Sequence, residues 1–339
     1  MALLSRDQGY VARRRGFVEQ LLGSEALILL LLLIVVVVVV LIAVPPARQP
    51  RTAFDLMREL SPFLIGTIGM SLLMIGGEFD LSIGSVIAMV TCITMAMFLK
   101  TENIWISVAA GLASGPIVGV LIGLMVTRLK MASLMTTLGM MFVIRGAVYV
   151  STNKAPILSG ENNVPDAFLA LYHSSLGPIP TPFLLAAALI AIFYILSTQT
   201  DFGRRIYAVG GNPSAARVSG IKVNQVKFIL FVLCSTLAAV AGMLVTAQIK
   251  TGYFDAGLGF ELTVIAATVL GGVSLSGGHG GLIGAVLGVL ILGVSNKALR
   301  LMGAATTTQM LATGLFMMFA LYLHTLRARL ATSWRKRQS

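Results

Sequence analysis

The run ALILLLLLIVVVVVVLIAV, residues 26–44, contains nineteen consecutive apolar residues. About 20 such residues in an α-helix cross the hydrocarbon core of a bilayer. Three arginines at 13–15 precede the run, as basic residues also do in a secretory signal peptide. Because the run is longer than the apolar region of such a peptide, and no small-residue cleavage site clearly follows it, we interpret it as an uncleaved first membrane span.

Composition extends this interpretation to the whole chain. Of the 339 residues, 57% are hydrophobic and only 11% are charged, whereas about 25% are charged in a soluble protein. The sequence therefore predicts an all-α, polytopic membrane protein. Its net charge of +12 is better explained by loops beside anionic lipid than by nucleic acid. Cys92 and Cys234 lie in apolar runs and the three histidines are scattered, so we expect neither a disulfide framework nor a metal centre.

Nine further apolar runs bring the predicted number of spans to about ten. Several are short or interrupted by glycine, and the number becomes eight or nine if some are broken or re-entrant. We divide the chain into a cytoplasmic leader (1–25), a membrane domain (26–326) and a basic cytoplasmic tail (327–339). The nine runs are residues 62–77, 84–99, 104–126, 132–150, 182–197, 226–247, 260–275, 281–295 and 306–326.

The basic residues of the loops predict the orientation. With the N-terminus in the cytoplasm, sixteen lysines and arginines fall on the cytoplasmic side and eight on the opposite side, while Arg145 lies within a span. Such an excess of positive charge marks cytoplasmic loops. It places both termini and residues 198–225 in the cytoplasm, and the loop 151–181 outside.

Residues 198–225, TQTDFGRRIYAVGGNPSAARVSGIKVNQ, form a long basic passage between apolar runs, and we call them the coupling loop. Asn212 suits an N-cap, Pro213 the first helical position, and Gly220 a left-handed end, so a helix of about two turns is expected. So short a helix is not stable alone in water. We expect its outer face to dock on a separate subunit; the alternative is a solvated loop that only fixes orientation. The candidate coupling residues are Arg204, Arg205, Asn212, Pro213, Ala215, Ala216, Arg217 and Gly220.

Polar residues interrupt the apolar sequence again at 76–85, GGEFDLSIGS. A carboxylate is expensive in lipid, so Glu78 and Asp80 are expected to face a cavity, a partner or the interface. Asp80 or Ser82 also suits an N-cap for the span that begins near Ile83. The two interpretations, a cap and a place in a solute path, are compatible.

Two more charged residues fall in or beside spans. Arg145 is the one basic residue deep inside a run, and we expect it to extend to the interface or to pair with an acid such as Glu78 or Glu261. Glu261 follows Gly257 and Gly259, and an acid in the first turn of a helix is favoured by the helix dipole. A helix start is therefore predicted there.

Glycines recur in two forms. Gly111, Gly115, Gly119 and Gly123 recur every four residues, as do Gly280, Gly284 and Gly288, which predicts closely packed helices. The segment 271–280, GGVSLSGGHG, contains LSGG, which also occurs in ATP-binding-cassette ATPases. Since the chain has no G-x-x-x-x-G-K-[ST] loop to cradle phosphates, we interpret this segment as a tight turn between two spans.

Four segments in order carry a family resemblance. They are GGEFDLSIGS at 76–85, TLGMMFVIRG at 137–146, DFGRRIYAVGGNPSAARVSGI at 201–221 and GLGFELTVIAATVLGGVSLSGGHG at 257–280, followed by Asn296 and Gln309. Through them the chain resembles the permease subunits of ribose-type ABC importers, which carry simple sugars and polyols. One departure is Glu78 with Phe79 before Asp80, where that family usually has a single isoleucine.

The resemblance implies a set of partners and a location. The partners are a second permease subunit, in a homo- or heterodimer, two cytoplasmic ATPase domains that use ATP, and a periplasmic sugar-binding protein. The location of the chain is the bacterial inner membrane. The resemblance also implies that 201–221 supplies the helix seated in the ATPase, that solute moves inward by alternating access, and that this chain is no enzyme and binds no cofactor. The candidate residues of the path or gate are Glu78, Asp80, Ser82, Arg145, Glu261 and Asn296.

Two other classes remain as alternatives. A secondary transporter driven by an ion gradient needs buried acids, and Glu78 with Asp80 is the one cluster in the sequence that could serve. An intramembrane enzyme needs a nucleophile–base pair, and the sequence offers none.

The missing phosphate-binding loop leads to a first prediction. The purified chain alone should neither bind nor hydrolyse ATP, because nothing in it can cradle phosphates. Photolabelling of the isolated chain with an azido-ATP analogue measures this, and labelling that excess ATP abolishes would contradict it.

Overall fold

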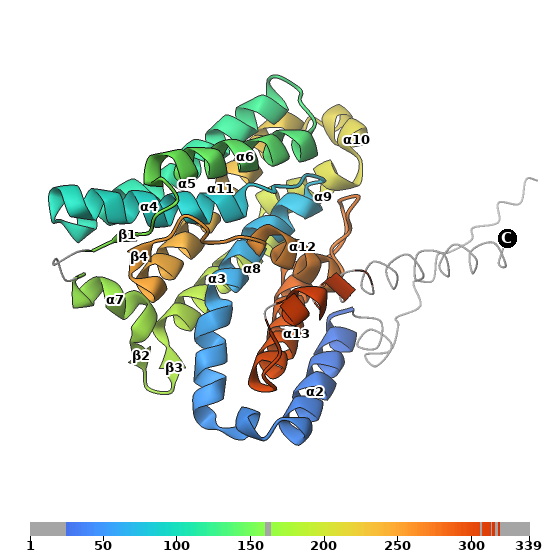
Figure 1. Cartoon of the computed structure of the whole chain (residues 1–339). Coiled ribbons are helices and arrows are strands. Elements are labelled where there is room, and N and C mark those ends of the chain that lie inside the picture. The colour runs from blue at the N-terminus through green and yellow to red at the C-terminus, as the bar shows by residue number, and fades with distance from the viewer. Residues whose placement is uncertain (1–24, 160–163, 306, 313, 316–317, 319–339) are drawn as a thin grey trace, which may run out of the picture.

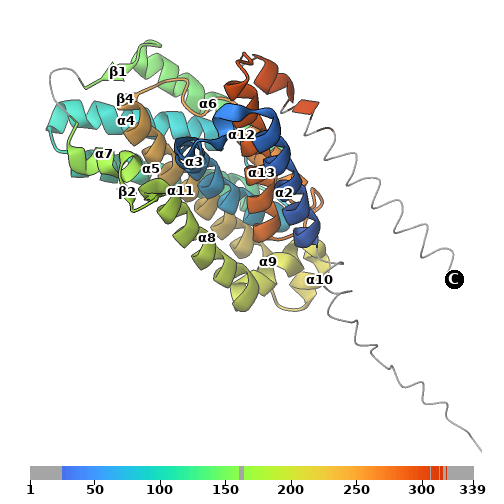
Figure 2. The same cartoon turned by 90° about the horizontal axis from the view of Figure 1, so that it is seen from below.

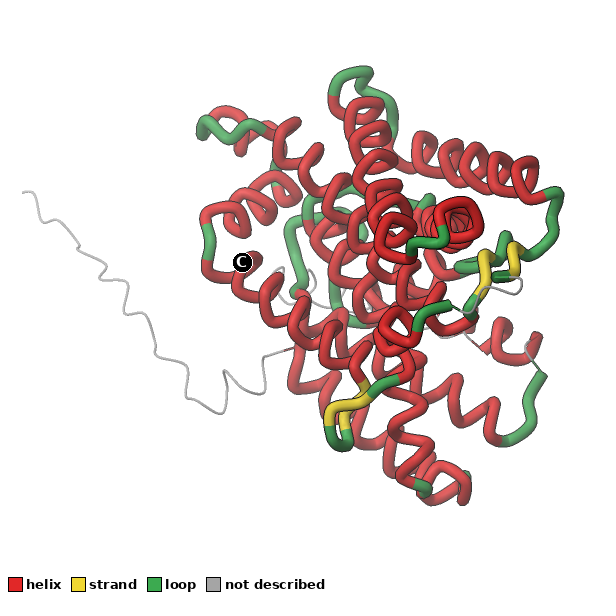
Figure 3. Tube along the Cα trace, turned by 90° about the vertical axis from the view of Figure 1, so that its left-hand side faces the viewer, coloured by secondary structure: helices red, strands yellow, loops and turns green. Residues whose placement is uncertain are grey.

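The chain folds almost entirely into helices, as the tube in Figure 3 shows. The structure is a computed structural model, and it describes residues 25–159, 164–305, 307–312, 314–315 and 318. The long helices are α2 (Glu25–Ala43), α3 (Pro50–Ile75), α4 (Ile83–Thr101), α5 (Ile104–Thr127), α6 (Ser133–Thr152), α8 (Thr181–Gln199), α11 (Val223–Ile249) and α13 (Leu282–Leu301).

Short elements lie between the long helices. The helices are η1 (Pro45–Arg48), α7 (Asp166–His173), α9 (Asp201–Gly211), α10 (Pro213–Val218) and α12 (Phe260–Leu270). The strands have two residues each and form two antiparallel pairs, β1 (Ile157–Leu158) with β4 (Thr251–Gly252), and β2 (Ser175–Leu176) with β3 (Ile179–Pro180). The predicted all-α class is confirmed.

The predicted spans are found with two corrections. Within the described residues, eight helices are long and apolar enough to cross a membrane. The run 260–275 is not one of them, because α12 ends at Leu270 and the chain then turns. Its 11 residues rise only about 16 Å, so α12 is a half-helix. The predicted span 306–326 falls largely outside the described residues, as do the leader and the tail.

The second correction concerns α3, which begins at Pro50 rather than near Pro62. Pro62 lies inside the helix without ending it. Neighbouring helices in a membrane protein compensate for the backbone bond that a proline removes, and from Leu60 to Ile75 every residue of α3 except Phe63 is buried. This helix is therefore central to the bundle.

The glycine ladders lie at close helix contacts, as predicted, except that Gly280 belongs to the turn before α13. A Cβ at Gly119 of α5 would lie 2.6 Å from the Cα of Val232 on α11, so the two backbones touch. On α13, Gly284 lies against the carbonyl of Gly271, and Gly288 against that of Ala267. These contacts bring α12 and α13 together around the turn that follows α12.

The molecule has two distinct ends. Figures 1 and 2 both place α9 and α10 at one end, and α7 with β2 and β3 at the other. The coupling loop and the 151–181 loop are thus on opposite sides of the bundle, which is what the charge pattern of the loops predicts.

Labelling of single cysteines tests the topology. Leu176→Cys and Val218→Cys are suitable because these side chains are 74% and 90% exposed, and the native Cys92 and Cys234 are buried and can be replaced by alanine. A membrane-impermeant maleimide should label position 176 in intact spheroplasts and position 218 only after permeabilisation, because the basic loops stay inside. Labelling of position 218 in intact spheroplasts would overturn the orientation.

Candidate coupling and translocation sites

The coupling loop consists of two helices rather than one. The sequence predicted α10 but missed α9, for which Thr200 is the N-cap: its hydroxyl accepts a hydrogen bond from the Gly203 amide at 3.2 Å. Arg204 pairs with Asp201 on the solvent side of α9. The signal that would have revealed α9 is a threonine cap followed by an acid in the first turn.

The predicted signals of α10 are confirmed. The Asn212 side chain accepts from the amides of Ser214 (3.1 Å) and Ala215 (3.0 Å), and Pro213 is the first helical residue. Gly220 follows the helix with φ +83°, a conformation that glycine adopts without steric cost. The sequence therefore fixes both ends of this helix.

The outward face of α10 is not quite the one predicted. Ala215 and Arg217 are exposed, whereas Ala216 is 4% exposed and faces the bundle. Ala216 therefore anchors the helix and cannot contact another subunit. Val218, which the sequence analysis did not single out, is 90% exposed and is therefore accessible beside Ala215 and Arg217.

Behind α10, three backbone segments meet at glycines. Gly77 after α3, Gly210 and Gly211 at the end of α9, and Gly277 and Gly278 in the turn before α13 pack directly on one another, and we call them the glycine junction. No side chain separates the backbones there. A movement of α9 would therefore displace both the end of α3 and the turn before α13.

Hydrogen bonds fix the glycine junction. The Gly278 amide donates to the Ile75 carbonyl at 2.8 Å, and the Tyr207 hydroxyl of α9 donates to the Gly280 carbonyl at 2.9 Å. Burial raises the pKa of Tyr207 above its ordinary value, so the hydroxyl remains a donor. The turn at 271–280 that the sequence predicted is thus tied to α3 and α9.

Asp80 does not cap α4. Its Oδ1 accepts from the amide (2.8 Å) and the hydroxyl (2.6 Å) of Ser82, and Oδ2 accepts from the Ser235 hydroxyl of α11 at 3.4 Å. A cap would accept from amides in the first turn of the helix, and Ser82, at the N-cap position, makes no such bond either. Both side chains are fully buried, and they hold the segment 76–82 against α11.

Glu78 forms an ion pair with Lys227 at the start of α11. Glu78, one of the two acids considered for Arg145, therefore does not pair with that arginine. Both side chains are largely buried, at 10% and 19% exposed, and they lie beside Arg217 and Lys130 in a cavity of about 460 Å³. The extra carboxylate of this chain is thus neutralised at the end that carries α10.

Arg145 binds backbone rather than an acid, which corrects the predicted ion pair. Its guanidinium donates to the carbonyls of Phe254 (3.0 Å) and Ala256 (2.9 Å), and one turn away the Tyr149 hydroxyl donates to Asp255 at 2.5 Å. Helix α6 therefore supports the irregular segment 251–259. Carbonyls in this segment have no helix to satisfy them, and the arginine supplies the missing donors.

Glu261 and Asn296 are the last two residues predicted for the path or gate. Glu261 is in the first turn of α12, as predicted, and is 8% exposed. A Cβ at Gly84 would overlap its carboxylate and the Gly257 carbonyl, so the starts of α4 and α12 touch. Asn296 of α13 lines a separate cavity of about 390 Å³. The six predicted path residues are thus not gathered at one point.

No metal site accompanies these residues. Among the described residues, no group of three His, Cys, Asp or Glu side chains is arranged to hold an ion. Glu78 is instead engaged by a lysine and Asp80 by hydroxyl and amide groups, whereas Oε2 of the buried Glu261 has no hydrogen-bond partner among the described residues.

Apolar spanning helices, satisfied chain breaks and a short capped helix at one end define a polytopic membrane protein of the permease class. The family described as "Branched-chain amino acid transport system / permease component" matches residues 52–321. The chain belongs to this family, and within it to the ribose-type permeases that the motifs predicted.

Three relatives illustrate the similarity. The ribose import permease protein of Escherichia coli is 36% identical over 268 residues, 79% of this chain and 83% of the relative. The L-arabinose transport system permease protein of Escherichia coli is 39% identical over 253 residues, 74% and 76% of the two chains. The ribose import permease protein of Bacillus subtilis is 34% identical over 275 residues, 81% and 85%. No solved structure matches the chain.

A pair of neighbouring glycines tests the junction. Gly210→Ala should lower the thermal stability of the purified permease, because the added Cβ overlaps the Ile75 carbonyl and lies 2.7 Å from the Gly278 amide. Overpacking of this kind costs about 1–3 kcal/mol. Gly211→Ala is the matched control, since its Cβ would meet nothing closer than 4.0 Å. Equal unfolding temperatures for the two variants would contradict the close packing.

Proposed function

We propose that this chain is the translocating subunit of an ABC importer that moves a simple sugar or polyol into the cytoplasm. Transport is driven by ATP hydrolysis on a separate ATPase, and the chain alternates between outward- and inward-open states. Membership of the ribose-type permeases supports the class, and the names of the ribose and arabinose relatives support the solute.

The observation that carries the proposal is the form of α10. The helix has six residues, too few for stability in isolation, yet it is capped at both ends and stands out from the bundle with Val218 exposed. A rigid, exposed apolar side chain beside Arg217 suits a groove with an apolar floor and an acidic wall. We infer that this groove belongs to the ATPase.

The path from the ATPase into the membrane domain runs through α9. A push on α10 reaches α9 directly, and from there the glycine junction passes it to the end of α3 and to the turn before α13. These two segments flank α12 and the chain breaks. ATP-driven movement of α10 would thereby rearrange the breaks around which the pathway opens and closes.

The remaining parts of the assembly follow from the family. A second permease subunit, identical or a paralogue, would complete the pathway, two ATPase subunits would bind the ATP, and a periplasmic protein would deliver the solute to the end opposite α10. The chain would lie in the bacterial inner membrane with both termini in the cytoplasm, acting as neither an enzyme nor a cofactor-binding protein.

The ion-driven alternative gains no support from the acids that prompted it. Glu78 is paired with Lys227, and Asp80 accepts hydrogen bonds from Ser82 and Ser235. These two carboxylates do not converge on a shared ion site. The coupling helix, by contrast, has no role in a transporter that works without an ATPase.

Substitution of Val218 tests the coupling. Val218→Ser should weaken ATPase docking about tenfold, since burial of a valine side chain is worth about 1.5 kcal/mol or more. Co-purified ATPase and ATP-driven sugar uptake should fall together, while expression and dimerisation stay normal. Two further variants, Ala215→Trp and Arg217→Glu, should act in the same direction through bulk and charge.

The matched control is Val150→Ser, because Val150 is also exposed (80%) but lies near the end of α6, far along the chain from α10. It should leave both co-purification and uptake unchanged. Normal uptake by Val218→Ser and Ala215→Trp at normal expression would show that α10 is not the coupling element.

A further inference from the structure

We propose that a cavity between α3, α11, α12 and α13 is a weak binding niche for a neutral polyhydroxy solute, and that Gln248, Thr263 and Asn296 are the groups that recognise its hydroxyls. This inference rests on the proposed function and names the site at which the chain itself would contact the solute. The cavity has a volume of about 390 Å³, within the range of about 300–1,000 Å³ that is usual for small-molecule sites.

The cavity lies at the end of the bundle that would receive the solute. Glu59 is on its rim, sixteen residues before Ile75 on α3, which corresponds to about 24 Å along the helix. Ile75 belongs to the neighbourhood of the glycine junction and α9. The part of the cavity that Glu59 lines is therefore remote from the coupling helix, on the side where a periplasmic protein would deliver its sugar.

The lining suits a molecule that is apolar on one face and hydroxylated at its edges. Phe63 and Phe260 both line the cavity and stack with ring centroids 4.7 Å apart. Phe260 is buried and supports Phe63, which is partly buried and would offer its outer face to the C–H face of a sugar ring. Gln248, Thr263 and Asn296 stand on three different helices around these rings. Amides and hydroxyls both donate and accept hydrogen bonds, as sugar hydroxyls require.

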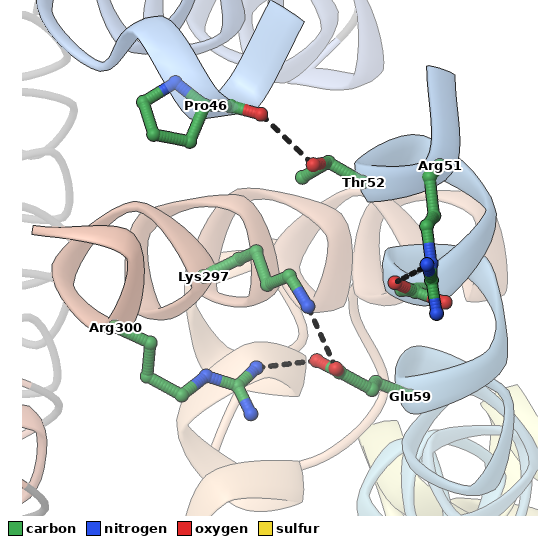
Figure 4. A network of polar contacts seen from close by, with 7 residues as sticks. Pro46, Arg51, Thr52, Glu59, Lys297 and Arg300 are labelled. Atoms are coloured by element: carbon green, nitrogen blue, oxygen red, sulfur yellow. Dashed lines mark hydrogen bonds and ion pairs between the residues drawn. The ribbon is translucent and has the colours of Figure 1, made fainter. Parts of the chain in front are cut away.

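The charges at the mouth favour a neutral solute. Of the described residues that line the cavity, the charged ones are Glu59 and Arg300. Figure 4 shows how Glu59 is held, with one oxygen 2.7 Å from Lys297 and the other 2.5 Å from Arg300. One carboxylate thus engages both cations and ties α3 to α13 across the rim. The interior beyond the rim carries amides, a hydroxyl and aromatic rings but no charged side chain.

Partial burial of the recognising groups explains why binding should be weak. Gln248 is exposed, Thr263 and Asn296 are half-buried, and the Thr263 hydroxyl already donates to the Gly259 carbonyl at 3.1 Å. Each hydrogen bond to a solute therefore competes with an existing one, to water or to the protein, and gains little. A transporter that bound sugar tightly would also release it slowly. The niche would therefore select and orient the solute without trapping it.

The test uses the whole transporter, with its ATPase and saturating sugar-loaded binding protein, in proteoliposomes. The probes are D-ribose, L-arabinose and ribitol, with D-gluconate as an anion, and the monodeoxy analogues of whichever neutral compound is imported. Thr263→Val and Gln248→Leu should each reduce its uptake about five- to tenfold, the effect of one lost hydrogen bond. Each variant should also discriminate less between that compound and at least one deoxy analogue, which a merely structural defect would not produce.

The matched control for Thr263→Val is Thr268→Val on the same helix. Both hydroxyls donate to a carbonyl four residues earlier, at 3.1 Å for Thr263 and 2.7 Å for Thr268, but Thr268 does not line the cavity. This control should keep the wild-type rate of uptake and the wild-type preference over the deoxy analogues.

Each other outcome is decisive. If Thr263→Val and Gln248→Leu keep normal uptake and preference while Val218→Ser abolishes uptake, the niche is wrong and the proposed function stands. If the wild-type transporter imports none of the neutral probes, both fail together, and preferential import of D-gluconate rules out a neutral solute. Loss of the permease dimer in Gln248→Leu would show that the second subunit fills the cavity.

Discussion

The fold depends on one constraint, that every backbone polar group inside a membrane must find a partner within the protein. Continuous helices satisfy this requirement, but the chain leaves helical structure at 76–82, 251–259 and 271–281. Each break is satisfied by specific contacts. At 76–82, Asp80 accepts a hydrogen bond from the Ser82 amide. At 251–259, Arg145 donates to backbone carbonyls, and at 271–281 the Gly278 amide donates to the Ile75 carbonyl at the end of α3.

These contacts also explain why the breaks are found next to glycines. A carbonyl of one segment can reach an amide of another only if the backbones approach without side chains between them. At the glycine junction this approach joins the end of α3 to α9 and to the turn before α13. The contacts of the glycine junction therefore connect the breaks at 76–82 and 271–281 to α9, which leads to α10.

At each end of the bundle, a largely buried glutamate is paired with basic side chains. A largely buried carboxylate is tolerated when a cation and hydrogen bonds replace its water. Glu78 has Lys227 at the end with α10, and Glu59 has Lys297 and Arg300 at the other end. Between these pairs, Asp80 is held by hydroxyl and amide groups and Arg145 by carbonyls, while Glu261 is buried at the start of α12. The neutral solute that we propose would meet amides, a hydroxyl and aromatic rings in the cavity beside α12.

The sequence by itself determined the class of protein, most of the spans and the ends of α10, because apolar run length, basic loops and capping residues act locally. The runs at 26–44 and 104–126 and the cap at Asn212 required no knowledge of distant segments. The partners of Arg145, Glu78 and Asp80 could be assigned only with knowledge of distant segments. The sequence therefore assigned these partners wrongly or left them open. Arg145 binds carbonyls 109 and 111 residues away, Glu78 pairs with a lysine 149 residues away, and Ala216 turned out to face the bundle. Only the tertiary structure decided these contacts, because the energy of a buried polar group depends on which donors and acceptors the fold brings to it, and sequence spacing does not contain that information.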